Sequence, residues 1–200
     1  MAEFDQFLPS LTPFISNSCP RIIMLNALKS AVRLFCEDSE VWVHDCPPIE
    51  IIEANTSQVR LDIPYQTMIC KMWTIEGRKY FHNVHRAYIQ FPHYHLNADN
   101  YLIFEEEIKH PPKTLRPVVS LATTQDSLSC PDFIYQRYHD AIISKCVVIL
   151  QSMPAQEWSN PSMLAIHEPL YAQHLEKAIK DRNDGFMLGR QTTRIKPTYM

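Results

Sequence analysis

Apolar residues repeat at helical spacing near both ends of this chain and at strand spacing between them, and this change of period limits the folds that it can adopt. Near the N-terminus, the pattern predicts an amphipathic helix that opens at Ser18-Cys19-Pro20 and runs to about Cys36, with proline at its first position. The apolar face of this helix is formed by Ile22, Leu25, Leu28, Val32 and Phe35.

Two more helices are predicted in the last third of the chain. Ser129-Cys130-Pro131 opens the first, and its later part is apolar on nearly every side, which is typical of a helix at the centre of a bundle. The second begins with Asn160 as its N-cap and ends at Gly185, and Pro169 inside it should kink or split it. Because no single helix can bury its apolar face alone, we expect the helices from the two ends to pack together.

Short β-branched and aromatic runs fill the middle of the chain, separated by Pro, Asn and Asp. Glu76-Gly77 and Asn97-Ala98-Asp99-Asn100 are predicted to be hairpin turns. Runs this close together leave no room for crossover helices, so they predict a small antiparallel sheet or sandwich. The predicted strands are Ile49–Ile52, Val59–Ile63, Met68–Ile75, Arg78–Phe81, Ala87–Phe91, Tyr101–Glu106 and Val118–Thr123.

The predicted fold class is therefore α+β: a helical bundle core from the N- and C-terminal helices, an inserted antiparallel β domain and an extended C-terminal arm. We divide the chain into a helical core (1–44 and 129–185), a β-rich insertion (45–128) and the arm (186–200). The residues expected in the helical core are Leu25, Leu28, Val32, Phe35, Trp42, Ile142, Cys146, Trp158, Leu164 and Leu175.

Composition excludes several classes of protein. A hydrophobic share of 46% excludes disorder for the body of the chain, and 3 Gly beside 15 Pro leave no GxGxxG or GxxxxGK[ST] loop for nucleotide phosphates. No apolar run approaches the roughly 18 residues that span a bilayer, and the first residues lack the basic region of a signal peptide. We therefore expect a soluble protein that is not secreted by the usual route.

Six cysteines lie 10 to 60 residues apart without a CxxC pair. Zinc ribbons need closely spaced ligand pairs, and disulfide scaffolds are shorter and denser in cysteine. The spacing therefore favours free, buried thiols.

Four histidines, His82, His85, His93 and His95, give the sharpest indication of an enzyme. Histidines two apart on a strand point to one face, as metal ligands in β-proteins do, and Asp99 or Glu105 could add a carboxylate. No HExxH motif supports such a site, and the same histidines fit an ordinary aromatic-rich sheet surface. A metal-dependent enzyme is thus the alternative interpretation, while the main one has no catalytic residue, metal or cofactor. The triplet Glu105-Glu106-Glu107 is interpreted as a solvated sheet edge.

The C-terminal end is basic. From Arg182 onward there are four basic residues and one acidic residue, a net charge of +3, which leaves −6 for the rest of a chain whose total is −3. Four charges over so long a segment give only modest affinity for phosphates. The segment is better suited to docking on a protein, where extended chains bind through backbone hydrogen bonds and alternate side chains.

Both ends of the chain resemble the head-to-tail adaptor (neck, or head-tail connector) proteins of tailed bacteriophages. The resemblance covers about residues 7–44 and 130–200, with the β-rich middle matched by position only. The motifs that carry it are Leu8-Pro9…Pro13, Cys19-Pro20, Ala27-Leu28…Ala31…Phe35-Cys36 followed by Trp42, Trp158-Ser159-Asn160-Pro161…Leu164-Ala165, a helix ending near Arg182, and Arg194-Ile195-Lys196-Pro197.

The resemblance implies a structural virion protein that forms a ring, commonly of about twelve copies (a dodecamer), beneath the portal vertex. Such a ring extends the DNA channel and connects capsid to tail, with the portal protein above and a tail tube or tail nozzle protein below. DNA would pass through without sequence-specific binding and no membrane would be involved, in the virion neck or, during assembly, in the host cytoplasm. The expected portal-binding residues are Phe186, Arg190, Arg194, Ile195, Lys196 and Tyr199.

Two departures from the family pattern are visible. Pro169 interrupts the helix before the arm, and the arm carries fewer arginines than usual. A third interpretation, beside the ring and the enzyme, is a host-side interaction module that forms no ring.

Overall fold

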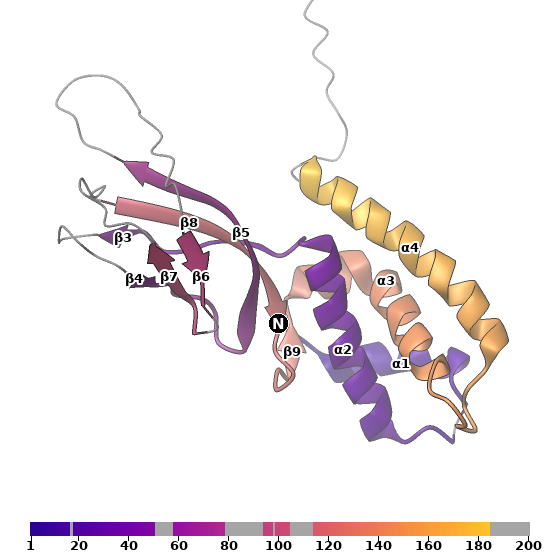
Figure 1. Ribbon diagram of the computed structural model, residues 1–200. Helices are drawn as coiled ribbons and strands as arrows, with labels where there is room; N and C mark the ends of the chain where they lie inside the picture. The colour runs from indigo at the N-terminus through magenta and orange to yellow at the C-terminus, as the bar shows by residue number, and fades with distance from the viewer. Residues whose placement is uncertain (17, 51–57, 79–93, 98, 105–113, 185–200) are drawn as a thin grey trace, which may run out of the picture.

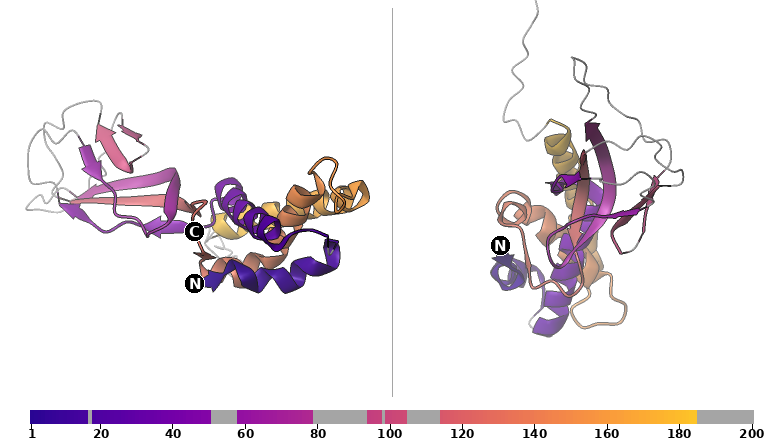
Figure 2. Two further views of the ribbon diagram at one scale, coloured as in Figure 1. Left: turned by 90° about the horizontal axis from the view of Figure 1, so that it is seen from below. Right: turned by 90° about the vertical axis from the view of Figure 1, so that its left-hand side faces the viewer.

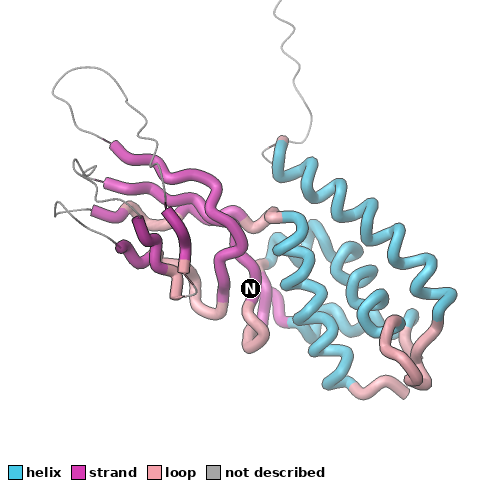
Figure 3. Tube along the Cα trace, viewed as in Figure 1, coloured by secondary structure: helices cyan, strands magenta, loops and turns pink. Residues whose placement is uncertain are grey.

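The fold is α+β, with helices at one end of the molecule and antiparallel sheets at the other (Figure 1, Figure 3). The computed structural model describes residues 1–16, 18–50, 58–78, 94–97, 99–104 and 114–184. The left view of Figure 2 shows the same separation, while in the right view the sheets face the viewer in front of the helices.

The first residues run in short helical turns: 3-10 helix η1 (Phe4–Phe7), helix α1 (Leu8–Leu11) and 3-10 helix η2 (Thr12–Phe14). Phe7 and Leu11 are completely buried. Apolar residues punctuated by proline thus form a compact lead into the first long helix.

Three long helices follow the predicted pattern: α2 (Arg21–Ser39), α3 (Asp132–Gln151) and α4 (Pro161–Asn183). Helix α3 packs against both α2 and α4. Asn160 caps α4 as predicted, because its side-chain oxygen accepts a hydrogen bond from the N–H of Ser162 at 3.0 Å.

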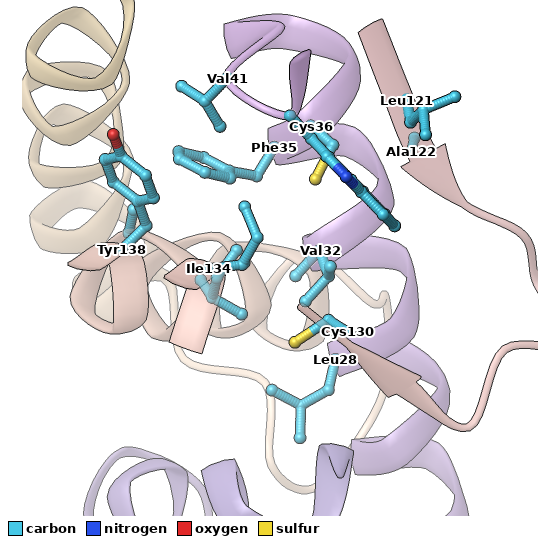
Figure 4. Packing of buried hydrophobic residues seen from close by; sticks show 14 of the residues in the cluster. Leu28, Val32, Phe35, Cys36, Val41, Leu121, Ala122, Cys130, Ile134 and Tyr138 are labelled. Carbon is cyan, nitrogen blue, oxygen red and sulfur yellow. The ribbon is translucent and has the colours of Figure 1, made fainter. Parts of the chain in front are cut away.

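The core lies between α2, α3 and the adjoining end of the sheet, as Figure 4 shows for residues such as Leu28, Val32 and Phe35. Of the ten residues expected in the core, five are completely buried: Leu28, Val32, Phe35, Ile142 and Cys146. Trp42 is 9% exposed, and Leu25, Trp158, Leu164 and Leu175 are partly buried. Trp42 follows α2, and its carbonyl accepts a hydrogen bond from Leu121 of the sheet at 2.8 Å.

Pro169 does not split α4, which is continuous through it. An interior proline removes the hydrogen bond to the carbonyl four residues earlier, here that of Ala165. Because Ala165 is exposed, water can take the place of the missing donor. Non-helical backbone occurs instead in α3, at Tyr138 (φ −121°, ψ 18°), where the sequence predicted no interruption.

Strand β8 (Thr114–Thr123) is the centre of a four-stranded antiparallel sheet. Strand β5 (Thr67–Arg78) pairs with one edge of β8 from end to end. The opposite edge of β8 pairs with two short strands, β2 (Val43–Asp45) and β3 (Ile49–Glu50). Trp42, between α2 and β2, joins the end of α2 to β8 through its carbonyl.

A second antiparallel sheet has the strand order β4-β7-β6, with bounds Gln58–Arg60, Tyr101–Phe104 and Tyr94–Leu96. A further short pair joins β1 (Ala2–Glu3) to β9 (Ser129–Cys130). The β-rich middle is therefore antiparallel wherever the structure describes its pairing.

One predicted turn is confirmed and the other is wrong. Asn97 accepts hydrogen bonds on its side chain from the N–H groups of Asp99 and Tyr101 (3.0 and 2.8 Å), and Asn100 has a left-handed φ of 63°, which closes the β6–β7 hairpin. Glu76-Gly77 lies inside β5, opposite β8. A glycine is tolerated within a strand, and here continuous pairing with a long neighbour outweighs its local turn tendency.

None of the described helices combines the length and the apolar character that a bilayer-spanning helix needs.

Among the described residues, Gln151 joins three segments near the start of α4. Its side-chain amide donates to the carbonyl of Phe14 at 3.1 Å and its side-chain oxygen accepts from the N–H of Asn160 at 2.5 Å, while its backbone carbonyl accepts from Ser159. Only 3% of Gln151 is exposed.

We expect Gln151→Met to lower the free energy of unfolding by about 2 kcal/mol, because it leaves the Phe14 carbonyl and the Asn160 N–H without their partner. The melting temperature should fall by roughly 4–8 °C. Gln156→Met, in the neighbouring loop, is the control, since Gln156 is exposed. Thermal unfolding followed by circular dichroism measures both variants, and equal melting temperatures would contradict the role given to Gln151.

Candidate functional site

The predicted arm and most of the predicted metal ligands lie outside the described residues. This holds for Phe186, Arg190, Arg194, Ile195, Lys196 and Tyr199, for His82, His85 and His93, and for Glu105-Glu106-Glu107. His95 lies in β6. Across the described ranges, no three His, Cys, Asp or Glu side chains form a group that could hold a metal ion.

The six cysteines are free thiols, as predicted, and five of them are buried while Cys70 is half-buried. Burial raises the pKa of every one, and it raises those of Cys70 and Cys130 to about 12. Because the thiolate is the reactive form, these thiols are poor nucleophiles at neutral pH. Their place in the fold is structural.

The structure does describe the base from which the C-terminal segment departs. This base is the point where the end of α4 meets the end of α2 and strand β5, and we call it the α4 anchor: Ser39, Glu40, Lys71, Trp73 and Arg182. Its members come from three separate elements, so the anchor fixes the end of α4 in the fold.

Glu40 is the polar centre of the anchor. It has a left-handed backbone (φ 53°) that ends α2, and its N–H donates to the carbonyl of Cys36 at 2.9 Å. Its carboxylate accepts hydrogen bonds from Lys71 at 3.0 and 3.1 Å and from Arg182 at 2.9 Å. The side chains of Glu40 and Arg182 are only 18% and 15% exposed, so this ion pair is less screened by water than a surface pair.

Arg182 makes two further contacts that tie α4 down. The same guanidinium nitrogen that meets Glu40 donates to the backbone carbonyl of Ser39 at 2.9 Å, one of the carbonyls left free at the end of α2. Its guanidinium carbon lies 4.9 Å from the ring centre of Trp73. Lys71 lies at the same distance from that ring, so the indole stabilises both cations.

A register shift in β5 makes room for Trp73. The pairing of β5 with β8 is irregular between Met72 and Thr74, and Trp73 has no partner residue there. Such a bulge redirects a side chain out of the regular alternation of the strand. Trp73 is 36% exposed and contacts the end of α4.

A second contact holds α4 to α2 closer to its middle. The hydroxyl of Tyr171 donates to the carboxylate of Asp38 at 2.9 Å, and the ammonium of Lys145 lies 4.4 Å from the tyrosine ring. Burial, together with the hydrogen bond to Asp38, raises the pKa of Tyr171 far above its ordinary value. The tyrosine therefore stays protonated and remains a donor at every physiological pH.

The start of α4 is held by His167. Its ring meets that of Phe14 edge to face, with centroids 4.8 Å apart, and only 5% of the residue is exposed. Its Nδ1 has no hydrogen-bond partner among the described residues. Burial lowers the pKa of His167, so the neutral ring is favoured at pH 7.

The contacts of the anchor hold the end of α4 in place and fix its orientation. The Glu40 carboxylate forms ion pairs with both Lys71 and Arg182, so the charged groups of the anchor bind one another. Helix α4 is thus fixed at its start, its middle and its end, where Asp184 is the C-cap.

Sequence reasoning did not find the anchor. Arg182 entered only as one of the charges of the basic end, and Glu40, Lys71 and Trp73 were not singled out. Arg182 and Glu40 are 142 residues apart, and periodicity carries information only about neighbours along the chain. The one local signal was the acidic run Glu37-Asp38-Ser39-Glu40 at the end of a predicted helix.

Compared with known proteins, the chain matches no family model and no curated protein.

We expect Arg182→Met to lower the free energy of unfolding by about 1–3 kcal/mol, because it removes a charged hydrogen bond and leaves the Ser39 carbonyl unpaired. Lys180→Met is the matched control: it removes the same charge from the same helix, but Lys180 is exposed. Urea unfolding followed by tryptophan fluorescence compares the two. If both variants lose the same stability, the anchor does not hold the end of α4.

The burial of His167 predicts how stability depends on pH. Its pKa is lower in the folded chain than in the unfolded chain, so only the unfolded chain gains a proton just below pH 6.5. The contribution of neutral His167 to the free energy of unfolding is therefore fully present above about pH 6.5. It falls by up to about 1.4 kcal/mol per pH unit as the pH drops toward the pKa of His167 in the folded chain.

His167→Phe keeps the ring contact and should flatten this part of the curve. His174→Phe, seven residues further along α4, serves as the control and should keep the wild-type slope. Denaturant unfolding between pH 5 and pH 8 measures both. A wild-type slope in His167→Phe would overturn the assignment.

Proposed function

We propose that this chain is a structural adaptor of a tailed-bacteriophage virion, which forms a ring under the portal, extends the DNA channel and connects capsid to tail. In this proposal the helices form a bundle core, the β-rich middle faces the next tail component, and residues 186–200 dock on the portal. The proposal assigns no catalytic residue. It rests on the resemblance of the two ends of the chain, and the α4 anchor is the observation that supports it best.

The anchor matters because a docking arm needs a rigid base. An arm that binds a partner transmits force and orientation only if its root is fixed to the rest of the chain. Here Arg182, two residues before the last described residue, is bonded to Ser39 and Glu40 of α2 and lies against Trp73 of β5. Tension on the arm would pass from α4 into both the helices and the sheet.

The charge distribution suits the same role. Residues 182–200 carry a net charge of +3 and the rest of the chain −6. A net negative body repels phosphates, which favours a channel through which DNA slides, while the basic end favours a partner surface of opposite sign. In a closed ring, each copy would present two different surfaces to its neighbours.

Removing residues 186–200 should leave a folded chain that no longer binds the portal protein encoded with it. The melting temperature should fall by no more than about 4 °C, because the anchor ends at Arg182 and stays intact. Mass photometry of each chain mixed with portal rings measures the loss of binding directly.

A full-length variant with Arg190, Arg194 and Lys196 all changed to Gln separates charge from chain length. It should bind more weakly than the parent and lose most of the parent's dependence on salt. Normal attachment of the truncated chain would refute the arm's role. Images of assembled particles in which the chain does not repeat around an axis would refute the ring.

A further inference from the structure

A shallow apolar groove lies next to the α4 anchor. It has a volume of about 300 Å³ and is lined by Val41, Val43, Phe133 and Arg137. Phe133 and Arg137 are four residues apart, so they lie on one face of the first turns of α3. A volume of this size is at the low end of ligand pockets and accommodates one or two large side chains.

One wall of the groove belongs to an edge strand. In the part of the chain that the structure describes, β2 forms backbone hydrogen bonds with β8 on one side, and Val43 at its start is 42% exposed. An exposed valine on a strand edge is a surface on which an extended chain can lie, with an apolar side chain in the groove.

The end of α4 lies close to this groove. Arg182 donates to the carbonyl of Ser39, and Val41 follows Ser39 by two residues. The last turn of helix α4 therefore lies near Val41, at one wall of the groove.

The sequence after Asp184 matches the apolar groove in chemistry and begins soon after the last turn of α4. Phe186-Met187-Leu188 is the apolar part of this segment, and it begins two residues after Asp184, a reach of about 7 Å in extended chain. Charged residues return only at Arg190. So short a tether gives an effective concentration in the millimolar range, so even a weak apolar contact is occupied.

We propose that Phe186, Met187 and Leu188 bind in the groove of their own chain, along the exposed side of β2. The aromatic side chain would contact Val41, Val43 and Phe133, and residues 189–200 would then leave the molecule in a fixed direction. This inference assigns Phe186 to the groove in place of the portal contact given to it above, and its test does not depend on what residues 189–200 bind.

The test uses the full chain with the photoreactive residue p-benzoylphenylalanine in place of Phe186. After irradiation, digestion and mass spectrometry, we expect crosslinks within one chain to peptides that contain Val41–Val43 or Phe133–Arg137. Val43→Asp should lower their yield by about tenfold, because it puts a charge in the apolar groove. Met68→Asp is the matched control, since Met68 is also a partly exposed apolar strand residue and should leave the yield unchanged.

A second measurement leaves the groove unaltered. In hydrogen exchange on the full chain, Phe186→Ser together with Leu188→Ser should speed exchange in peptides covering residues 41–45, while Ile195→Ser should not. Crosslinks between two chains would assign the groove to a second copy and overturn the proposal. Crosslinks elsewhere on the chain, or exchange that is unchanged in the double variant, would overturn it too.

Discussion

The apolar contact between α2 and α3 is the constraint on which the rest of the fold depends. These helices are separated along the chain by the entire β-rich middle, yet they share a core in which the rings of Phe35 and Tyr138 lie 5.2 Å apart. Burial of such faces provides most of the stabilisation of a helical assembly but little directional information. Directed polar contacts at Gln151 and Arg182 add that information, because each has partners on separate segments.

Much of the fold could be predicted because its signals are local. The three long helices, the Asn160 cap and the Asn97–Asn100 turn each depend on residues within a few positions of one another. The wrong predictions occur where contacts with residues distant in the sequence, or with solvent, determine the local structure. Glu76-Gly77 has the composition of a turn, but it and the residues before and after it pair with β8. Pro169 lies where solvent can compensate for its missing donor.

The candidate site could be predicted only in part. The role of the segment after α4 stays a prediction, since that segment lies outside the described residues. What holds the end of α4 was not predicted, because Glu40, Trp73 and Arg182 become neighbours only once three elements have packed. Spacing along the chain cannot carry that information. The bulge that frees Trp73 is a property of the pairing of two strands, and it has no counterpart in either strand alone.

The burial of the cysteines determines how readily the chain reacts with oxidants and thiol reagents. Six thiols with raised pKa values, five of them buried, react slowly with oxidants and with one another's disulfides. The five buried thiols are therefore slow to form disulfides. Half-buried Cys70 is the position that a thiol reagent would reach first, which makes it a natural attachment point for a single probe on the strand that carries Trp73.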